Sequence, residues 1–228
     1  ITNEFIEYVF DEIDIDFVDL QKIGVTGGKS SNLSNKFKDV PIVKIDEEEA
    51  IGRGVMALYD ISDESFLAVS TGTGTACIHH SNGKFNYLGG ISVGGGTLQG
   101  LSKYLISTEN VKDIEELAKK GDRKELDFLI GDVVNKVGSL NQNITASNFG
   151  KAKNNKNNSK EDTAASLSNM IGEVIGTISY LNALLCNENK VYFLGRTSLN
   201  SVIKTGIEDR LKLANISGVF KENREYGN

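Results

Sequence analysis

Two glycine-rich segments carry the strongest chemical signal in this chain. Threonine and glycine alternate in residues 71–75, after Ser70, and residues 89–97 contain three consecutive glycines before Thr97. Glycine lacks a Cβ, so an anion can reach backbone N–H groups there. A glycine run that opens a helix adds the positive end of the helix dipole. A tight hairpin or a flexible loop would explain either segment alone, but two of them separated by one β-ribbon predict phosphate binding.

The acidic run Asp46-Glu-Glu-Glu49 is the second candidate for chemistry. A solvated helix start is the simpler interpretation, because the helix dipole stabilises carboxylates there. We expect Asp46 to cap this helix, with Glu49 completing a capping box. A carboxylate at a strand-to-helix junction could also act as a general base toward a hydroxyl.

The histidines and cysteines favour structural roles. His79 and His80 are adjacent on an expected strand and should point to opposite faces. No further His/Cys cluster completes a metal site with them, so no protein metal site is predicted. Cys186, at a helix end, is expected in the core, and two cysteines fit a reducing, cytoplasmic compartment rather than a disulfide framework.

The elements that must position these residues alternate between strands and helices. This mixture predicts α/β lobes around a mixed sheet. Residues 138–160 are polar, and residues 151–160 are expected to be an exposed loop. Strands are expected at 20–25, 40–45, 66–69, 76–79, 84–88, 190–194 and from 219; helices are expected at 3–13, 46–59, 97–105, 161–186 and 198–213, with two more across 111–136.

The overall composition excludes two classes of partner. The 228 residues include 25 Lys plus Arg against 31 Asp plus Glu, a net charge of −6, which argues against bulk nucleic-acid binding. No stretch approaches the roughly 18 apolar residues of a membrane span, so no membrane partner is expected. A weaker signal is the turn after the apolar strand at 190–194, which contains Gly195 and Asn200. Turns of this kind can bring the backbone close to a planar ligand, but they also occur in many α/β proteins without one.

Four short motifs follow one another along the chain: VTGG at 25–28, VKIDE at 43–47, VSTGTGT at 69–75 and GGISVGGGTLQGL at 89–101. Their order resembles that of type II (eukaryotic-like) pantothenate kinases. ITASNFG at 144–150 is similar to another signature of the family, and VYFLG at 191–195 with Asn200 resembles its adenosine-side segment. The sequence thus resembles this family over nearly its whole length.

The resemblance implies an α/β, actin-like ATPase fold of the acetate/sugar-kinase superfamily, with ribonuclease H-like lobes. Residues 1–65 would be the remainder of an incomplete N-terminal lobe. Residues 66–228 would form the C-terminal lobe, with the nucleotide loops and a dimerisation helix at 161–186. A cytoplasmic homodimer is expected.

The resemblance also implies a reaction. ATP, with Mg²⁺, would phosphorylate pantothenate to 4′-phosphopantothenate, the first step of coenzyme A biosynthesis, and coenzyme A or an acyl-CoA is a further expected ligand. Glu47 matches the family's catalytic carboxylate and would deprotonate the acceptor hydroxyl. The resemblance assigns Gly72, Thr73, Gly74, Thr75, Gly94, Gly95, Gly96, Gly195 and Asn200 to the nucleotide, and Tyr87, Thr145 and Ser147 to the acceptor.

The sequence departs from the family pattern in three places. The opening phosphate motif of the kind DxGGTxxK is absent, so we expect an incomplete copy that is not a competent kinase by itself. Tyr87 stands where the family has a basic residue, and Gln142-Asn143 stand where it has Gly-Asp. Two alternatives therefore stay open: a kinase for a sugar or another small metabolite, and a non-catalytic paralogue that binds nucleotide or acyl-CoA.

Overall fold

The computed structural model describes residues 2–27, 30–134, 141–154 and 158–227. Gly28 of the VTGG segment lies outside this part of the chain. The helices are α1 (Asn3–Glu12), α2 (Glu47–Tyr59), α3 (Gly95–Ile106), α4 (Val111–Lys120), α5 (Ile130–Val133), α6 (Lys160–Cys186) and α7 (Ser201–Leu213). The strands are β1 (Ile23–Val25), β2 (Lys36–Phe37), β3 (Val40–Lys44), β4 (Phe66–Thr71), β5 (Thr75–Ser81), β6 (Lys84–Ile91), β7 (Phe128–Leu129), β8 (Thr145–Ser147), β9 (Lys190–Leu194) and β10 (Ser217–Val219).

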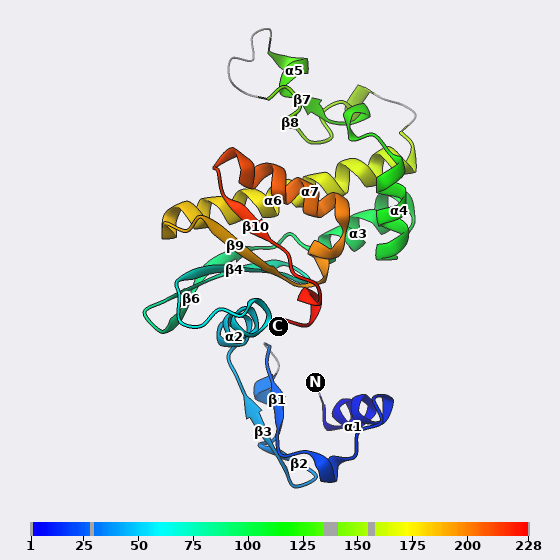
Figure 1. Cartoon of the computed structure of the whole chain (residues 1–228). Coiled ribbons are helices and arrows are strands. Elements are labelled where there is room, and N and C mark those ends of the chain that lie inside the picture. The colour runs from blue at the N-terminus through cyan, green and yellow to red at the C-terminus, as the bar shows by residue number, and fades with distance from the viewer. Residues whose placement is uncertain (1, 28–29, 135–140, 155–157, 228) are drawn as a thin grey trace.

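A five-stranded mixed sheet forms the centre of the molecule, in the order β10-β9-β4-β5-β6. β9 is parallel to both β4 and β10, whereas β4, β5 and β6 form an antiparallel meander. The predicted mixed sheet is therefore confirmed. Helix α2 covers one face of the sheet, and α6 with α7 covers the other (Figure 1). Because both faces are covered, β4 is buried along its whole length.

Helices α6 and α7 pack closely because small residues lie at their contact. A Cβ added to Gly172 would lie 2.4 Å from the carbonyl oxygen of Ile203, and one added to Gly206 would lie 3.1 Å from that of Asn169. Ile171 and Ile175 of α6 are fully buried in the core cluster on this side of the sheet. The pair α6–α7 therefore forms a rigid layer behind the sheet.

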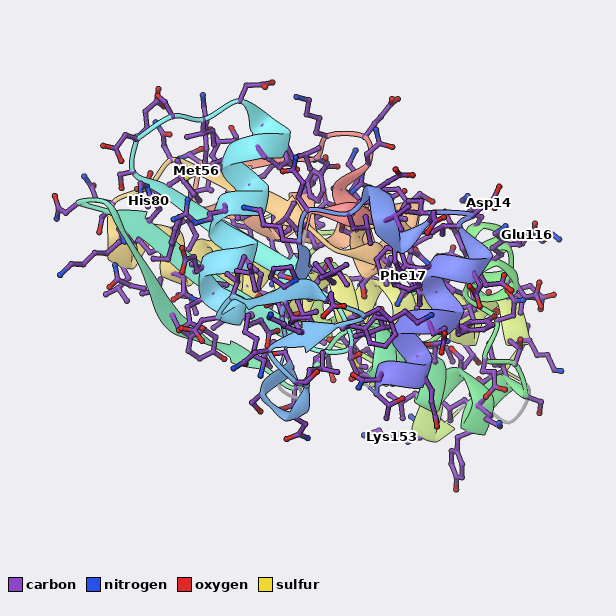
Figure 2. All side chains as sticks on the ribbon, turned by 90° about the horizontal axis from the view of Figure 1, so that it is seen from below. Asp14, Phe17, Met56, His80, Glu116 and Lys153 are labelled. Carbon is purple, nitrogen blue, oxygen red and sulfur yellow. The ribbon has the colours of Figure 1, made fainter. Side chains whose placement is uncertain are left out.

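Helix α2 is held against the opposite face by its apolar side. Ile51 and Val55 pack against Phe66, Ile78 and Leu194 of the sheet. Viewed from below in Figure 2, α2 lies across the strands, with the labelled Met56 near its C-terminal end. This packing fixes the position of the first turn of α2, where the acidic run lies.

The N-terminal residues form a separate small cluster. Strands β1, β3 and β2 make a three-stranded sheet, and α1 packs on it through Ile6. Phe17, labelled in Figure 2, lies in this cluster and contacts the ring of Phe37. A boundary drawn by packing would fall before α2, which packs on the large sheet; the division between residues 65 and 66 stays a prediction.

Several predicted details differ from the structure. The second helix expected within 111–136 is wrong: after α4 the chain makes a short 3-10 turn, strand β7 and a single turn, α5, and residues 135–140 lie outside the described part. Helix α4 ends before Gly121, where a Cβ would lie 2.1 Å from the carbonyl oxygen of Glu161. Further along the segment Asp127 is fully buried and accepts hydrogen bonds from Ser166 and the Phe149 N–H. Burial outweighs these hydrogen bonds and raises the pKa of Asp127.

Two helix starts and one loop also differ from the prediction. Asp46 stands at the N-cap of α2 but its side chain makes no capping hydrogen bond, so that expectation is wrong. Helix α7 begins at Ser201 rather than 198, after a 3-10 turn at Arg196–Leu199. Residues Ala152–Asn154 of the expected loop form another 3-10 turn, and residues 155–157 lie outside the described part. Within the described residues, no helix has the length and hydropathy needed to cross a membrane.

Candidate active site

The glycine- and threonine-rich loop between β4 and β5 is anchored to the turn that follows β9. The hydroxyl of Thr71 donates to the carbonyl oxygen of Leu194 at 2.8 Å and accepts from the Ser198 N–H at 3.2 Å. The hydroxyl of Thr197 donates to the carbonyl oxygen of Gly72 at 2.8 Å. These hydrogen bonds join segments more than 120 residues apart and hold the loop in one place.

The triple-glycine segment packs directly on this loop. The N–H groups of Gly95 and Gly96 donate to the carbonyl oxygens of Gly72 and Thr73, at 2.8 and 3.0 Å. A Cβ on Gly94 would lie 2.7 Å from the carbonyl oxygen of Thr73. The expectation that these N–H groups at the start of α3 are free for phosphate is therefore wrong for Gly95 and Gly96. Their glycines are explained by the close approach of the two segments.

Gly195 and Asn200 have structural roles beneath the loop. Gly195 has a φ of +91°, and a Cβ there would lie 2.5 Å from the carbonyl oxygen of Thr71. Asn200 is 2% exposed, and its side-chain oxygen accepts from the N–H groups of Val202 and Ile203, which caps α7. Their assignment to the adenosine side of a nucleotide stays a prediction.

Glu47 and the loop line the same pocket. This pocket has a volume of about 470 Å³. An adjoining pocket of about 220 Å³ shares Glu47, Ala76 and Tyr87 with it. The structure therefore brings together the predicted base, the loop and one predicted acceptor residue. The larger pocket is lined by Glu47, Ser70, Gly72, Thr73, Gly74, Thr75, Ala76, Tyr87, Gly90, Ile91 and Ser92.

Regular hairpin pairing with Ile78 places Tyr87 on the pocket side of β6, and a β-bulge follows it. Ile78 pairs with Tyr87, whereas Cys77 pairs with Gly89, so Leu88 is an extra residue in β6. Gly89 has a φ of +111°, which glycine adopts without strain. Leu88 packs on the α6 side of the sheet, and Tyr87 lies on the α2 side, lining both pockets.

Thr145 and Ser147 lie elsewhere in the chain. They form β8, on the far side of α6 and α7 from α2 (Figure 1). Ser147 is exposed, whereas Thr145 is buried and donates to the carboxylate of Glu173 at 2.6 Å. The structure of one chain therefore does not bring these two residues to the pocket of Glu47.

Glu173 is a buried charged residue that the sequence patterns did not single out. It is 8% exposed, and it accepts hydrogen bonds from Thr145 and Asn148 and pairs with Arg210 at 3.1 Å. Burial by itself would raise its pKa, but these hydrogen bonds and the charge of Arg210 outweigh burial and hold the pKa of Glu173 below its ordinary value. One sequence signal could have identified Glu173: it is a single carboxylate in the middle of the apolar helix pattern at 161–186.

We expect Glu173→Gln to lower the melting temperature at pH 7 and to have a progressively smaller effect in acid. Because folding lowers the pKa of Glu173, its stabilisation is full above the unfolded pKa, about 4.3, and disappears as pH falls toward the folded value. Melting temperatures between pH 7 and pH 3 test this, with the exposed Glu116→Gln on α4 as control. Parallel curves for wild type and Glu173→Gln down to pH 3 would contradict the expectation.

The histidines and cysteines lie outside the pocket. His79 lies 3.1 Å from both Glu188 and the hydroxyl of Ser65, and His80 contacts the carbonyl oxygen of Glu64 at 2.8 Å; both sets of contacts support structural roles. Cys77 is fully buried, and burial raises its pKa to about 12. Cys186, at the end of α6, is only half-buried, so the prediction that it lies in the core is not confirmed.

Sequence comparison places most of the chain in one family. A sequence model of the Fumble family matches residues 64–205. A type II pantothenate kinase of Bacillus cereus (strain G9842) is 36% identical over 191 residues, covering 80% of this chain and 69% of the relative. Another, from Bacillus thuringiensis subsp. konkukian (strain 97-27), is 34% identical over 222 residues, covering 92% and 78%.

Solved structures show the same fold. The activator of the 2-hydroxyisocaproyl-CoA dehydratase from Clostridium difficile, with bound ADPNP, has a TM-score of 0.64 at 15% identity, covering 97% of this chain and 75% of its own. A ROK hexokinase from Thermus thermophilus has a TM-score of 0.53 at 12% identity, covering 82% and 64%. The mixed α/β fold is thus that of the actin-like ATPases and sugar kinases, and the chain belongs to the type II pantothenate kinase family.

Proposed function

We propose that this protein transfers the γ-phosphoryl group of ATP to the hydroxyl of pantothenate, which gives 4′-phosphopantothenate and begins coenzyme A biosynthesis. The observation that carries the proposal is the shared pocket of Glu47 and the loop at 72–75. The names of the relatives, which are pantothenate kinases, support the choice of acceptor.

The pocket offers the two components that phosphoryl transfer needs. Such transfer depends on positioning and charge stabilisation more than on covalent chemistry by the protein. Glu47 would orient the acceptor hydroxyl and accept its proton. The loop at 72–75 would hold the phosphates, because a Cβ on Gly72 would meet no atom within 4 Å and its backbone is open to a ligand.

The donors in this pocket fit Mg²⁺ carried by the nucleotide. Among the described residues, no three His, Cys, Asp or Glu side chains gather into a metal site. The hydroxyls of Ser70 and Thr73 are oxygen donors of the kind that Mg²⁺ accepts alongside phosphate oxygens and water. When bound with ATP, Mg²⁺ would neutralise charge on the transferred group.

We also infer a homodimer, in which the exposed C-terminal part of α6 takes part. Leu181, Leu184 and Leu185 are 51%, 58% and 78% exposed there. A second copy would offer one way for the exposed Ser147 to reach an acceptor bound near Glu47, whereas Thr145 would first have to leave Glu173. Coenzyme A or an acyl-CoA as a further ligand and a cytoplasmic location remain parts of the same proposal.

A coupled assay of ATP consumption by the full-length protein tests the acceptor. We expect turnover with pantothenate and none above background with a panel of sugars. Turnover with a sugar alone would favour the metabolite-kinase alternative. Binding of ATP without turnover of any acceptor would favour a non-catalytic paralogue, and either result would contradict the proposal.

A further inference from the structure

Arg224 is a buried cation to which the proposed function gives no role. It is only 9% exposed. Its Nε donates to the hydroxyl of Ser198 at 2.9 Å, and its Nη groups donate to the carbonyl oxygens of Lys221 and Ser198, at 3.0 and 2.8 Å. All of these acceptors are neutral. Taking a charged group out of water is costly unless an opposite charge lies beside it, so the burial of Arg224 points to a role.

The carboxylates near Arg224 do not pair with it. Asp60, at the end of α2, pairs with Lys221 at 2.9 Å. Glu225 is the next residue in the chain, but one of its carboxylate oxygens is buried without a hydrogen-bond partner. The guanidinium carbon lies 5.6 Å from the ring centre of Phe220, a contact that attracts a cation without neutralising it. Among the described residues, Arg224 thus forms no ion pair with a carboxylate.

Hydrogen bonds connect Arg224 with the loop between β4 and β5. The carbonyl oxygen of Arg224 accepts from the Gly195 N–H at 2.9 Å, and the Ser198 hydroxyl donates to the carbonyl oxygen of Gly195 at 3.0 Å. The Ser198 N–H donates in turn to the hydroxyl of Thr71, where the loop begins. The turn at 195–198 is therefore bonded to Arg224 on one side and to the loop on the other.

The pocket that this loop lines has no cationic side chain of its own. Among the described residues that line it, none is Lys, Arg or His, and Glu47 adds a negative charge. The N–H groups of Gly95 and Gly96 already donate to the loop. A positive charge behind the loop would still reach phosphates bound in front of it, because little water screens a charge inside a protein.

We propose that Arg224 is a positioning residue that stabilises the nucleotide phosphates through the turn at 195–198. The inference rests on the proposed function, which places the phosphates at residues 72–75. Arg224 holds the turn against the loop and puts an unpaired positive charge behind it. A bound polyphosphate supplies the opposite charge that Arg224 lacks, whereas the uncharged nucleoside does not.

Isothermal titration of the full-length protein with adenosine and with a non-hydrolysable ATP analogue tests this role. Arg224→Gln removes the charge, and we expect binding of the analogue to weaken about tenfold while the dissociation constant for adenosine stays within about twofold of wild type. Arg224→Lys keeps the charge and should bring binding of the analogue back to within about threefold. The matched control, Arg53→Gln, removes the same charge from an exposed position on α2 and should change neither dissociation constant.

Ser198→Ala provides a second test that applies even if Arg224→Gln does not fold. It leaves the charge in place but removes the hydroxyl that connects the guanidinium to the turn. We expect about threefold weaker binding of the analogue and unchanged binding of adenosine.

Equal losses for adenosine and the analogue would assign Arg224 a merely structural role and overturn the inference. Wild-type affinity for the analogue in Arg224→Gln or Ser198→Ala would overturn it too, as would a wild-type protein that binds the analogue no more tightly than adenosine. Turnover of pantothenate is measured separately. If it is absent, the proposed function fails, and the dissociation constants still decide the role of Arg224.

Discussion

Glu47→Gln lowers the rate of phosphoryl transfer about 10²–10⁴-fold, the range that a positioned general base contributes. The exchange keeps the shape of the side chain and removes its capacity to accept a proton. The packing of Ile51 and Val55 against the sheet holds the first turn of α2 in place, so the fold should be unchanged. Rapid-quench measurement of a single turnover isolates the chemical step, and titration with ATP should show a dissociation constant within about threefold of wild type.

Glu49→Gln is the matched control for this experiment. Glu49 lies in the same turn of α2 but pairs with Arg53 on the exposed side. We expect its rate to stay within about threefold of wild type, since exposed ion pairs of this kind contribute little. A Glu47→Gln protein that transfers phosphate as fast as Glu49→Gln would remove Glu47 as the base.

Gly195→Ala should be the most destabilising single methyl addition at the site, by about 3 kcal/mol. The φ of +91° is strained for any residue with a Cβ, and the added Cβ would lie 2.5 Å from the carbonyl oxygen of Thr71. Both strands that meet here, β4 and β9, are buried and cannot easily move. For a protein of this size the melting temperature should fall by about 6–12 °C, measurable by calorimetry or circular dichroism.

Gly100→Ala serves as the control for adding a methyl group to a glycine. Gly100 lies inside α3, is exposed, and a Cβ there would meet no atom within 4 Å. We expect this substitution to raise stability by about 0.5–1 kcal/mol, the difference in helix propensity between alanine and glycine. If Gly195→Ala melts at the wild-type temperature, the close approach of Gly195 to Thr71 is not a constraint on this fold.

The sequence predicted the elements with strong local signals. The apolar period of residues 161–186 predicted α6 to within one residue, and the Asn82-Gly83 pair predicted the β5–β6 hairpin. Both turn residues have positive φ, as a tight hairpin of this kind requires. The central mixed sheet followed from these local signals.

Long-range contacts explain what the sequence could not show. Helix α4 ends where Gly121 packs against the backbone of Glu161, and the segment after it is held by hydrogen bonds from Phe149 and Ser166 to Asp127, 22 and 39 positions away. The N–H groups of Gly95 and Gly96 find partners in a loop more than 20 residues earlier. A glycine run signals close approach, but the sequence does not say whether a ligand or another part of the chain comes close.

The candidate site was predicted only in part. The position of Glu47 came from the family resemblance, since an acidic helix start is common in any protein. Tyr87 lies beside Glu47 because α2 packs on the face of the sheet to which Tyr87 points, a long-range contact that the sequence did not reveal. Thr145 was assigned to the acceptor, yet within one chain its hydroxyl is used by Glu173.

A crystal structure of the full-length protein with a non-hydrolysable ATP analogue and the acceptor is the most direct test of the account. We expect the acceptor hydroxyl within about 2.6–3.2 Å of a carboxylate oxygen of Glu47, the reach of a general base, and the β- and γ-phosphates against residues 72–75. Phosphates bound away from this loop, or an acceptor hydroxyl directed away from Glu47, would contradict it.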